Sequence, residues 1–360
     1  MLQLNVLAID PGSTSTKIGA WLNGELTKST IYHPKELIDA FDDIPSQKGM
    51  RLQAIREFLA KNQMDNVEFD AVVGRGGLIR PLRSGVYEVN SAMLKDLNKG
   101  YNGQHASNLG GILASELARI YGCKAFIVDP VVVDEMDRIA RYSGLRQIER
   151  RSIFHALNQK AVARRAADRL GKRYEDVNLI VAHLGGGISV GLHRKGRVSD
   201  VNNALDGDGP FAVNRSGGLP VGDLLKLLQS GEYSPQQLKD TISRAGGVYS
   251  YLGETDMRKI ERMIEDGNGY ANEVIDAMTY QVAKEIGALA VAAAGSIDGV
   301  VLTGGLAKSN MIVERIKNRV AFIARVFVFP GEFELEALIE ASLRALEGKE
   351  PIRTYPDKEN

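Results

Sequence analysis

The segment VLAIDPGSTSTKIGAW, which runs from Val6 to Trp21, sets the organisation of the rest of the chain. Its first apolar run ends at the carboxylate of Asp10, a turn rich in glycine and hydroxyl groups follows, and the chain becomes apolar again after Lys17. Two strands joined by such a loop predict a β-hairpin. Its closely spaced N–H groups, hydroxyls and ammonium suit a nucleotide phosphate, although a plain surface hairpin has the same composition.

A second segment, LIVAHLGGGISVGLHRKGRV from Leu179 to Val198, repeats this outline. Glycines of the second strand and of its turn recur at one constant offset: Gly19 with Gly191, and Gly24 with Gly196. Asp10 and His183, which end the first strands, are one residue out of this offset, so the loop contains a one-residue gap. A repeat of this length indicates two similar domains, although two hairpins can also resemble each other by chance.

Length and composition set the general class of the protein. A chain of 360 residues has room for about two domains, and 44% hydrophobic with 25% charged residues is typical of a soluble globular protein. A net charge of zero argues against a nucleic-acid partner and gives no support to a role at a membrane surface. The single cysteine, Cys123, excludes an internal disulfide and argues against a thiolate metal site. Without a signal-peptide pattern, a cytoplasmic location is expected.

Strand-like and helical segments alternate along the chain, which predicts α/β layers. We expect a helix capped by Ser152 and ending near Leu170, a long helix over Glu273–Ala294, and a last helix from Glu334. Paired glycines beside the strands, including Gly76-Gly77 and Gly110-Gly111, are interpreted as loops that converge on a ligand. A third such turn, Thr303-Gly304-Gly305, follows a late strand.

Several longer motifs show that the chain resembles the acetokinase family, within the superfamily of acetate and sugar kinases, Hsp70 and actin. Within that family it resembles the butyrate kinases. The motifs are IDPGSTSTK (Ile9–Lys17), VVGRGG (Val72–Gly77), HASNLGG (His105–Gly111), AFIVDPVVVDEM (Ala125–Met136), RRSIFHALNQKAVARR (Arg150–Arg165), AHLGGGISVG (Ala182–Gly191), VNNALDGDGPF (Val201–Phe211), RSGGLPVGDL (Arg215–Leu224) and VVLTGGLA (Val300–Ala307).

The resemblance implies an α/β fold of duplicated ribonuclease H-like (actin-like ATPase) domains with an ATP cleft between them. It assigns residues 1–150, completed by the C-terminal helix 335–360, to the first domain and residues 151–334 to the second. The implied activity is reversible, ATP- and Mg²⁺-dependent phosphorylation of a short-chain fatty acid, butyrate or a branched acid, to an acyl phosphate. The alternatives are an acetate or propionate kinase and an actin- or Hsp70-like ATPase. A homodimer or higher homo-oligomer is implied as well.

A substrate carboxylate is already ionised near neutral pH, so the transfer needs positioning and charge stabilisation rather than a strong base. By resemblance the catalytic residues are Asp129, His155, Arg75 and Arg215. Acetate kinases use two arginines whose aligned positions here hold Val72 and Pro220, and Arg75 and Arg215 lie close by. His105 and Asn108 are implied to contact the acid.

Nucleotide and metal residues are implied in the same way. The nucleotide set is Gly12, Ser13, Thr14, Ser15, Lys17, His183, Gly185, Gly186, Gly187, Asp256, Arg258, Gly304, Gly305, Leu306, Ala307 and Lys308. Asp10 and Glu334 are expected to serve Mg²⁺, with Glu332 as the alternative to Glu334. His33 and His193 match no family position and are expected at the surface.

Overall fold

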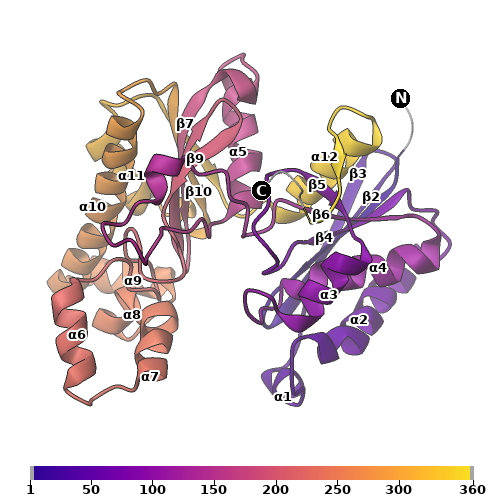
Figure 1. The fold of residues 1–360 in the computed structure, drawn as a ribbon, viewed down its shortest axis with the longest axis horizontal. Helices are drawn as coiled ribbons and strands as arrows, with labels where there is room; N and C mark the ends of the chain where they lie inside the picture. Colours follow the sequence, from indigo (N-terminus) through magenta and orange to yellow (C-terminus); the bar gives the residue numbers. More distant parts are fainter. Residues whose placement is uncertain (1–3, 357–360) are drawn as a thin grey trace. The chain divides into compact units, whose positions relative to one another are not determined.

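The computed structural model describes residues 4–356 and divides the chain into two compact units. Unit 1 contains the chain up to Asp134 and again from Phe333, and unit 2 is the continuous segment Glu135–Glu332. Residues 135–137 already bond within unit 2, since the N–H of Asp137 donates to the carbonyl of Ser199 at 2.8 Å. Figure 1 shows both units coloured along the chain.

Unit 1 is built on a seven-stranded sheet in the order β12-β5-β6-β4-β1-β2-β3. Its strands are β1 (Val6–Pro11), β2 (Ser15–Leu22), β3 (Glu25–Tyr32), β4 (Ala71–Arg75), β5 (Val86–Glu88), β6 (Lys124–Val128) and β12 (Ile352–Arg353). β1, β2 and β3 form an antiparallel meander, while β4 pairs parallel to β1 and β6 parallel to β4.

Unit 2 repeats this topology in a five-stranded sheet, in the order β11-β10-β7-β8-β9. Its strands are β7 (Asn178–Leu184), β8 (Ile188–Arg194), β9 (Arg197–Val201), β10 (Gly299–Gly304) and β11 (Val326–Pro330). β7, β8 and β9 form the meander, β10 is parallel to β7, and β11 is parallel to β10. The order β6-β4-β1-β2-β3 of unit 1 is thus reproduced strand for strand, which confirms the duplicated α/β fold.

The two hairpins match in detail. The turn residues Asn23-Gly24 and Lys195-Gly196 all have positive φ, between 49° and 89°, as a two-residue turn that follows the twist of its strands requires. At the other end, Asp10 lies opposite Lys17, whereas His183 lies opposite Ser189. The loop of unit 2 is therefore one residue shorter, as the gap in the repeat predicts.

Helices cover both faces of the sheet in unit 1. They are α1 (Lys35–Asp39), α2 (Lys48–Lys61), α3 (Ser91–Lys99), α4 (Asn108–Tyr121) and α12 (Glu334–Leu346). A short turn of 3-10 helix covers Pro45–Gln47 in unit 1, and another covers Arg138–Arg141 in unit 2. Ile18 packs with α2 and α4 in one buried cluster. The next residue, Gly19, faces Ile339 of α12. Since successive residues of a strand face opposite sides, α12 covers the face opposite α2 and α4.

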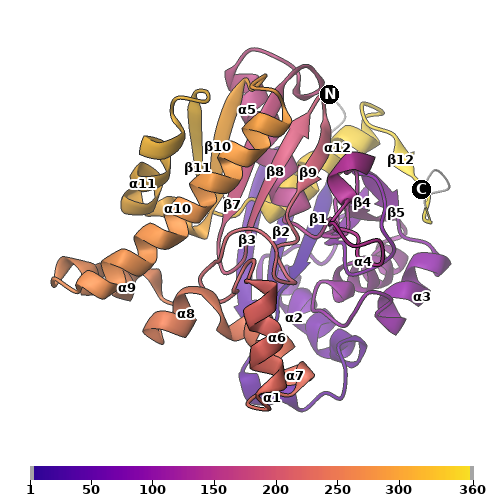
Figure 2. The ribbon, with the colours of Figure 1, turned by 60° about the vertical axis from the view of Figure 1, so that its left-hand side comes forward.

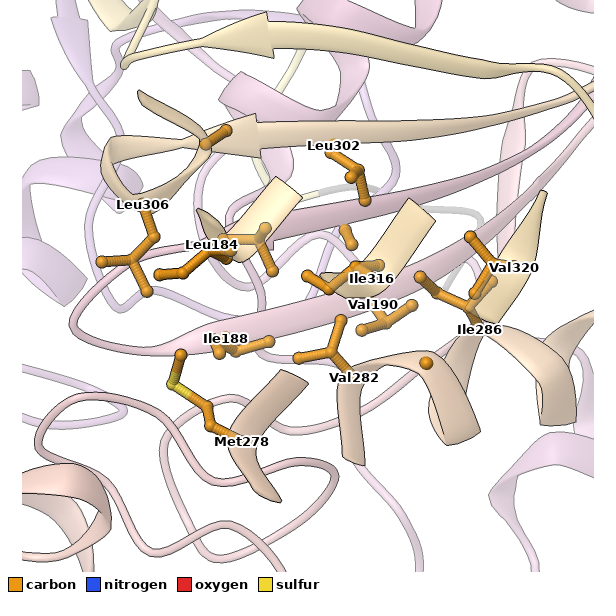
Figure 3. Packing of buried hydrophobic residues seen from close by; sticks show 14 of the residues in the cluster. Leu184, Ile188, Val190, Met278, Val282, Ile286, Leu302, Leu306, Ile316 and Val320 are labelled. Atoms are coloured by element: carbon orange, nitrogen blue, oxygen red, sulfur yellow. The ribbon is translucent and has the colours of Figure 1, made fainter. Parts of the chain in front are cut away.

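Unit 2 has the same layering. Its helices are α5 (Ala156–Arg169), α6 (Val221–Gln229), α7 (Pro235–Asp240), α8 (Gly247–Leu252), α9 (Met257–Glu265), α10 (Gly269–Ala292) and α11 (Asn310–Val320), with short helical turns at Tyr174–Asp176, Thr241–Ala245 and Gly305–Lys308. Helices α10 and α11 pack on one face of the sheet, where Val190 and Leu302 meet Val282 and Ile316 in a single core (Figures 2 and 3). The opposite face contacts α5, because Gly191 faces Gln159.

Two sequence-based expectations about local structure are wrong. Helix α5 begins at Ala156 with His155 at its N-cap, rather than near Ser152. The preceding chain is tied down in a non-helical path, since the carbonyl of Ile153 accepts the N–H of Ala204 at 2.9 Å. The expected helix over Glu273–Ala294 is confirmed as α10, and the last helix begins at Glu334 as predicted. Within residues 4–356 no helix has the length and apolar character needed to cross a membrane.

The pair Gly110-Gly111 is among the glycine pairs interpreted as ligand loops, whereas the helical periodicity of Leu109 to Tyr121 predicts a helix there. The structure confirms the helix, and the pair lies buried in α4. A Cβ on Gly110 would lie 2.0 Å from the carbonyl oxygen of Arg75, and a Cβ on Gly74 would lie 2.0 Å from that of Gly110. Because these glycines lack a Cβ, the backbone at the start of α4 packs directly against the backbone of β4. This close approach fixes the chain that carries Arg75.

Candidate functional site

The β1–β2 loop of unit 1 exposes its centre and anchors its ends. Ser13 and Thr14 are exposed, while the N–H of Gly12 donates to the carbonyl of Ser15 at 2.8 Å across the loop. The strand positions on either side, Pro11 and Thr16, are buried. The predicted phosphate loop is thus a short, closed turn at the surface of unit 1.

Arg51 of α2, which the sequence analysis missed, supports this loop from below. Its guanidinium is fully buried and donates to the carbonyls of Gly12 at 2.9 Å and Ser15 at 2.8 Å, and to the hydroxyl of Thr16 at 3.0 Å. Gln47 accepts from the same guanidinium at 2.9 Å. Burial lowers the pKa of Arg51 to about 10, so the group still carries its positive charge near neutral pH. The loop therefore rests on a buried cation.

The two predicted metal residues lie together in unit 1. The ammonium of Lys17 is 3.8 Å from a carboxylate oxygen of Asp10 and 3.9 Å from one of Glu334, and both carboxylates are buried. Arg75 donates to the other oxygen of Asp10 at 3.2 Å. The alternative residue, Glu332, is exposed. Strands β1, β2 and β4 and the first turn of α12 thus bring together two carboxylates and two cations.

Asp129 follows β6 in a left-handed conformation, with φ of 38°. Its carboxylate accepts the hydroxyl of Ser84 at 2.6 Å and the N–H of Gly85 at 2.8 Å, and its exposed fraction is 9%. No helix begins at Pro130, so among the described residues Asp129 does not act as a helix cap. A non-glycine residue held in this backbone region is typical of a functional position.

The residues expected to contact the acid differ in exposure. His105 is exposed, and its Nδ1 lies 2.8 Å from the hydroxyl of Ser107. Asn108 is fully buried at the start of α4, where its side-chain oxygen accepts the N–H of Leu78 at 2.8 Å and its nitrogen donates to the carbonyl of Gly103 at 3.1 Å. The amide of Asn108 therefore joins two loops of unit 1.

In unit 2 the glycine loop after β7 packs against Arg215. Nη1 of Arg215 donates to the carbonyl of Ala204 at 2.7 Å and lies 2.1 Å from the point where a Cβ on Gly187 would stand. Nε of Arg215 and Oδ1 of Asn214 are buried without a hydrogen-bond partner among the described residues. Burial lowers the pKa of Arg215, opposed by the charge of Asp206. A buried, incompletely paired guanidinium at this loop suits an anionic ligand.

Two predicted histidines of unit 2 stack on each other. The rings of His155 and His183 have centroids 3.8 Å apart and planes inclined by 7°. Asn158 Oδ1 accepts from Nδ1 of His183 at 2.9 Å and from the hydroxyl of Thr303 at 3.2 Å. The glycine loop after β7 passes close to the imidazole of His183, because a Cβ on Gly185 would lie 3.4 Å from Nε2 of this ring.

The residues expected near the nucleoside lie in separate elements of unit 2. Leu306 and Ala307 belong to the buried core, whereas Gly305 and Lys308 are exposed (Figure 3 shows Leu306). Asp256 caps α9, since its carboxylate accepts the N–H of Arg258 at 3.0 Å, and it pairs with the Arg258 guanidinium at 2.8 Å. The hydrogen bonds from Arg258 lower the pKa of Asp256 to about 2. Asp256 is therefore a charged helix cap.

The expectation that His33 and His193 lie at the surface is wrong. His33 is 7% exposed and its Nε2 lies 2.8 Å from the hydroxyl of Thr16. His193 is fully buried, with Nδ1 2.7 Å from the hydroxyl of Tyr174. Burial lowers the pKa of both imidazoles, and that of His193 falls well below its ordinary value. Both side chains are paired with polar groups in the interior, which the sequence pattern does not reveal.

Comparison with models of known protein families identifies one matching family. The family model described as the acetokinase family matches residues 142–326, more than half of the 360 residues. The chain belongs to the acetokinase family.

Solved structures agree in fold with this acetokinase. It is similar to Porphyromonas gingivalis acetate kinase, with 20% identity and a TM-score of 0.74 over 94% of this chain and 99% of that one. It is also similar to a propionate kinase from Francisella tularensis subsp. tularensis SCHU S4, with 17% identity and a TM-score of 0.74 over 94% and 98%. The acetate kinase from Entamoeba histolytica shares 19% identity at a TM-score of 0.72, over 94% and 99%.

Family membership gives the acetokinase its general chemistry. It is a phosphotransferase that uses ATP and acts on a short-chain carboxylate or its acyl phosphate. The motifs VNNALDGDGPF and RSGGLPVGDL, and the loop that follows β7, all lie inside the matched range 142–326. Asp10, Arg75 and Asp129 of unit 1 lie outside it.

Proposed function

We propose that this acetokinase phosphorylates butyrate, or a branched acid of similar size, in preference to acetate and propionate. The support is the run of motifs quoted above, which extends from Ile9 to Ala307 and so beyond the matched range. The replacement of the expected arginines by Val72 and Pro220 fits a pocket reshaped for a longer acyl chain. One methylene in an apolar pocket changes discrimination by only about 1–3 kcal/mol, so the preference must be measured.

The observation that carries the phosphotransferase chemistry is the grouping of His155, His183 and Arg215 around the glycine loop of unit 2. A carboxylate nucleophile is already ionised, so this reaction needs donors and positive charge around the phosphoryl group rather than a strong base. Two imidazoles and a partly unpaired guanidinium beside backbone N–H groups supply them. We assign the transferring phosphoryl group to these side chains.

In unit 1 we assign the phosphate-facing role to Gly12, Ser13, Thr14 and Ser15, since the exposed hairpin loop rests on the charge of Arg51. Asp129 orients the substrate or a metal-bound water, a role supported by its left-handed backbone and its two fixed donors. Arg75 contributes charge through its contact with Asp10. His105 contacts the acid, while Asn108 acts by holding the loops around residues 78 and 103.

Nucleoside contacts are assigned to Asp256, Arg258 and the segment Gly304–Lys308. Because Leu306 and Ala307 lie in the core, only the backbone of those two residues is available to a nucleotide. Gly305 and Lys308 are exposed and supply the remaining contacts. Lys17 is assigned to the phosphates, which would draw its ammonium from the carboxylates of Asp10 and Glu334.

Asp10 and Glu334 are the residues that would hold Mg²⁺. Carboxylate oxygens are the ligands that Mg²⁺ prefers, and it is commonly held by one or two of them together with phosphates and water. Such a two-carboxylate site agrees with the described residues 4–356, which contain no group of three or more acidic, histidine or cysteine side chains arranged to bind a metal. The burial of Glu334 and the exposure of Glu332 favour Glu334. When bound, the ion would neutralise charge on the phosphates.

We further propose that residues 1–150 with 335–360, and residues 151–334, are the functional domains, and that both contribute to one reaction. A homodimer or higher homo-oligomer is expected, which light scattering of the purified protein measures. These assignments concern function, and the structural units described above divide the chain at residues 134 and 332.

The decisive experiment traps the acyl phosphate with hydroxylamine. Purified protein, ATP and Mg²⁺ are incubated separately with acetate, propionate, butyrate and isobutyrate, and the acyl hydroxamate is quantified over time. The proposal predicts the highest kcat/KM for butyrate or isobutyrate. A preference for acetate or propionate would remove the butyrate assignment and leave the family chemistry intact. ATP hydrolysis without any hydroxamate would favour an actin- or Hsp70-like ATPase instead.

A further inference from the structure

A chain of hydrogen bonds in unit 2 connects the buried interior to His155, and the roles assigned above do not use it. Its members, in order, are Tyr174, His193, Gln159, Ser189 and His155. The four steps between side chains measure 2.7, 3.0, 2.8 and 2.9 Å. His193, Gln159 and Ser189 are fully buried, so water does not compete for these bonds.

The donor-to-acceptor direction of these hydrogen bonds is fixed at Gln159. The backbone carbonyl of Ser189 lies 3.0 Å from one end of the Gln159 amide. A carbonyl only accepts, so that end must be the nitrogen, Nε2. The other end, Oε1, therefore faces Nε2 of His193 at 3.0 Å, and this imidazole nitrogen must carry the proton. Nδ1 of His193 then accepts the hydroxyl of Tyr174.

The same logic continues to His155. The hydroxyl oxygen of Ser189 accepts from Nε2 of Gln159 at 2.8 Å and from the N–H of His155 at 3.4 Å. Both lone pairs of the oxygen are then used, so its own proton points to Nδ1 of His155 at 2.9 Å. Nδ1 of His155 is therefore an acceptor, and a neutral imidazole in this state carries its proton on Nε2.

We propose that Gln159 and Ser189 are positioning residues that hold His155 as the neutral tautomer protonated at Nε2. In this tautomer Nε2 of His155 is a hydrogen-bond donor, and the ring is not a second cation beside the stacked ring of His183. Two positive imidazoles with centroids 3.8 Å apart would repel each other, which this arrangement avoids. The tautomer itself does not depend on the reaction, whereas its effect on turnover rests on the proposed function.

Gly191, the repeated glycine in the second strand of the unit 2 hairpin, supplies the space that the hydrogen-bonded Gln159 needs. A Cβ on Gly191 would lie 2.6 Å from Oε1 of Gln159. At the equivalent position of unit 1, the three atoms nearest to a Cβ on Gly19 would be apolar carbons of Leu26, Leu335 and Ile339. The same site in the duplicated fold thus packs a core in unit 1 and admits a polar amide in unit 2.

Nitrogen-15 NMR of the histidine side chains in the full-length protein tests the proposal. The chain has only five histidines, so single substitutions assign every signal. The wild-type protein should show His155 with one protonated nitrogen, Nε2, and one acceptor nitrogen, Nδ1. A His155 signal with the proton on Nδ1, or on both nitrogens, near neutral pH would overturn it. This spectrum decides the question even if a variant does not fold.

Variants add a second, independent readout. Ser189→Ala and Gln159→Leu should both introduce the Nδ1-protonated form of His155, while Ser189→Thr, which keeps the hydroxyl, should retain the wild-type spectrum. In the hydroxamate assay the first two should lower kcat about 10²-fold or more, as a wrong imidazole tautomer does elsewhere, with KM for ATP changed less than about 2-fold. Unchanged His155 signals in both Ser189→Ala and Gln159→Leu would refute the role. If no acid is phosphorylated, the NMR result stands and only the catalytic consequence fails.

Discussion

The guanidinium of Arg215 occupies the space beside Gly187 in which any other residue would place its Cβ, 2.1 Å from Nη1. The glycine of the loop and the arginine beneath it therefore form one structural unit. The same nitrogen, Nη1, donates a hydrogen bond to the carbonyl of Ala204 at 2.7 Å, which holds the guanidinium in this place. A change at either residue must move the other.

Gly187→Ala should displace Arg215 and lower kcat/KM in the hydroxamate assay about 10²-fold, because a displacement of about 1 Å in a positioned group is enough for such a loss. The matched control is Gly222→Ala in α6, where a Cβ meets nothing within 4 Å. That change should leave activity intact and stabilise the protein by about 0.4–1 kcal/mol. Equal activity in both variants would contradict the coupling.

The two candidate arginines can be separated by single substitutions. Arg215→Gln should lower kcat about 10³-fold, since an arginine that stabilises a transferring phosphoryl group contributes at least this much elsewhere. Arg75→Gln should act more weakly on kcat, because Arg75 pairs with Asp10 at 3.2 Å. Arg173→Gln, which removes an exposed ion pair with Asp176, serves as the control. Wild-type kcat/KM in both Arg75 and Arg215 variants would rule out the assignment of displaced arginines.

The metal assignment rests on one buried and one exposed glutamate. Glu334→Gln should raise the Mg²⁺ concentration required for half-maximal activity about 10-fold or more, because it removes one of two charged ligands. Glu332→Gln should leave that concentration unchanged, since Glu332 is exposed. Titrating Mg²⁺ after removing bound metal with a chelator measures both. The reverse order of effects would transfer the role to Glu332.

Arg51 offers a test of the loop in unit 1. Arg51→Lys keeps the charge but cannot donate at once to Gly12, Ser15 and Thr16. KM for ATP should rise about 10-fold and the free energy of unfolding should fall by about 1–3 kcal/mol, the cost of unsatisfied buried acceptors. Arg56→Lys, at an exposed position of the same helix, is the control. An unchanged KM would show that the loop does not need this support.

His193 should make stability depend on pH. Its folded-state pKa lies well below 6.5 because of burial, with the charge of Lys160 adding to the shift. The unfolded chain therefore takes up a proton near pH 6.5 that the folded protein excludes, so stability is complete above this pH and falls below it. The slope approaches about 1.4 kcal/mol per pH unit for one proton.

Denaturant titrations between about pH 7 and pH 5 measure this slope. His193→Asn should lower stability at every pH but reduce the slope, because asparagine does not titrate. His105→Asn, at an exposed histidine, should leave the slope unchanged. A slope that is the same in wild type and His193→Asn would show that His193 is not the group responsible.

The hairpin repeat predicts the architecture well, because strand alternation, turn glycines and the one-residue gap are local properties. Gly24 and Gly196 adopt the positive φ that their turns require, and the register of Asp10 and His183 follows from the gap. The proximity of Asp10 and Glu334 was expected only through resemblance, since β1 and α12 lie at opposite ends of the sequence.

Buried polar side chains could not be predicted from local sequence patterns. Arg51, His33 and His193 look like surface residues in the sequence, yet their partners come from other elements. Gly110 was interpreted as part of a ligand loop because a glycine pair does not reveal whether a ligand or a neighbouring backbone approaches it. His155 fell at a helix start instead of inside the helix because a tertiary contact of Ile153 overrides the local capping signal.

The return of the chain to unit 1 at Phe333 gives synthesis on the ribosome a particular order. Strands β1 to β6 of unit 1 emerge first, but the sheet face next to Gly19 stays uncovered until α12, with the fully buried Leu338, has been translated. Unit 2 is uninterrupted and lacks this dependence. At about 5–20 residues per second, the delay is on the order of ten seconds or more. The first part to be made is thus the last to be finished, and nascent chains need protection from aggregation during that interval.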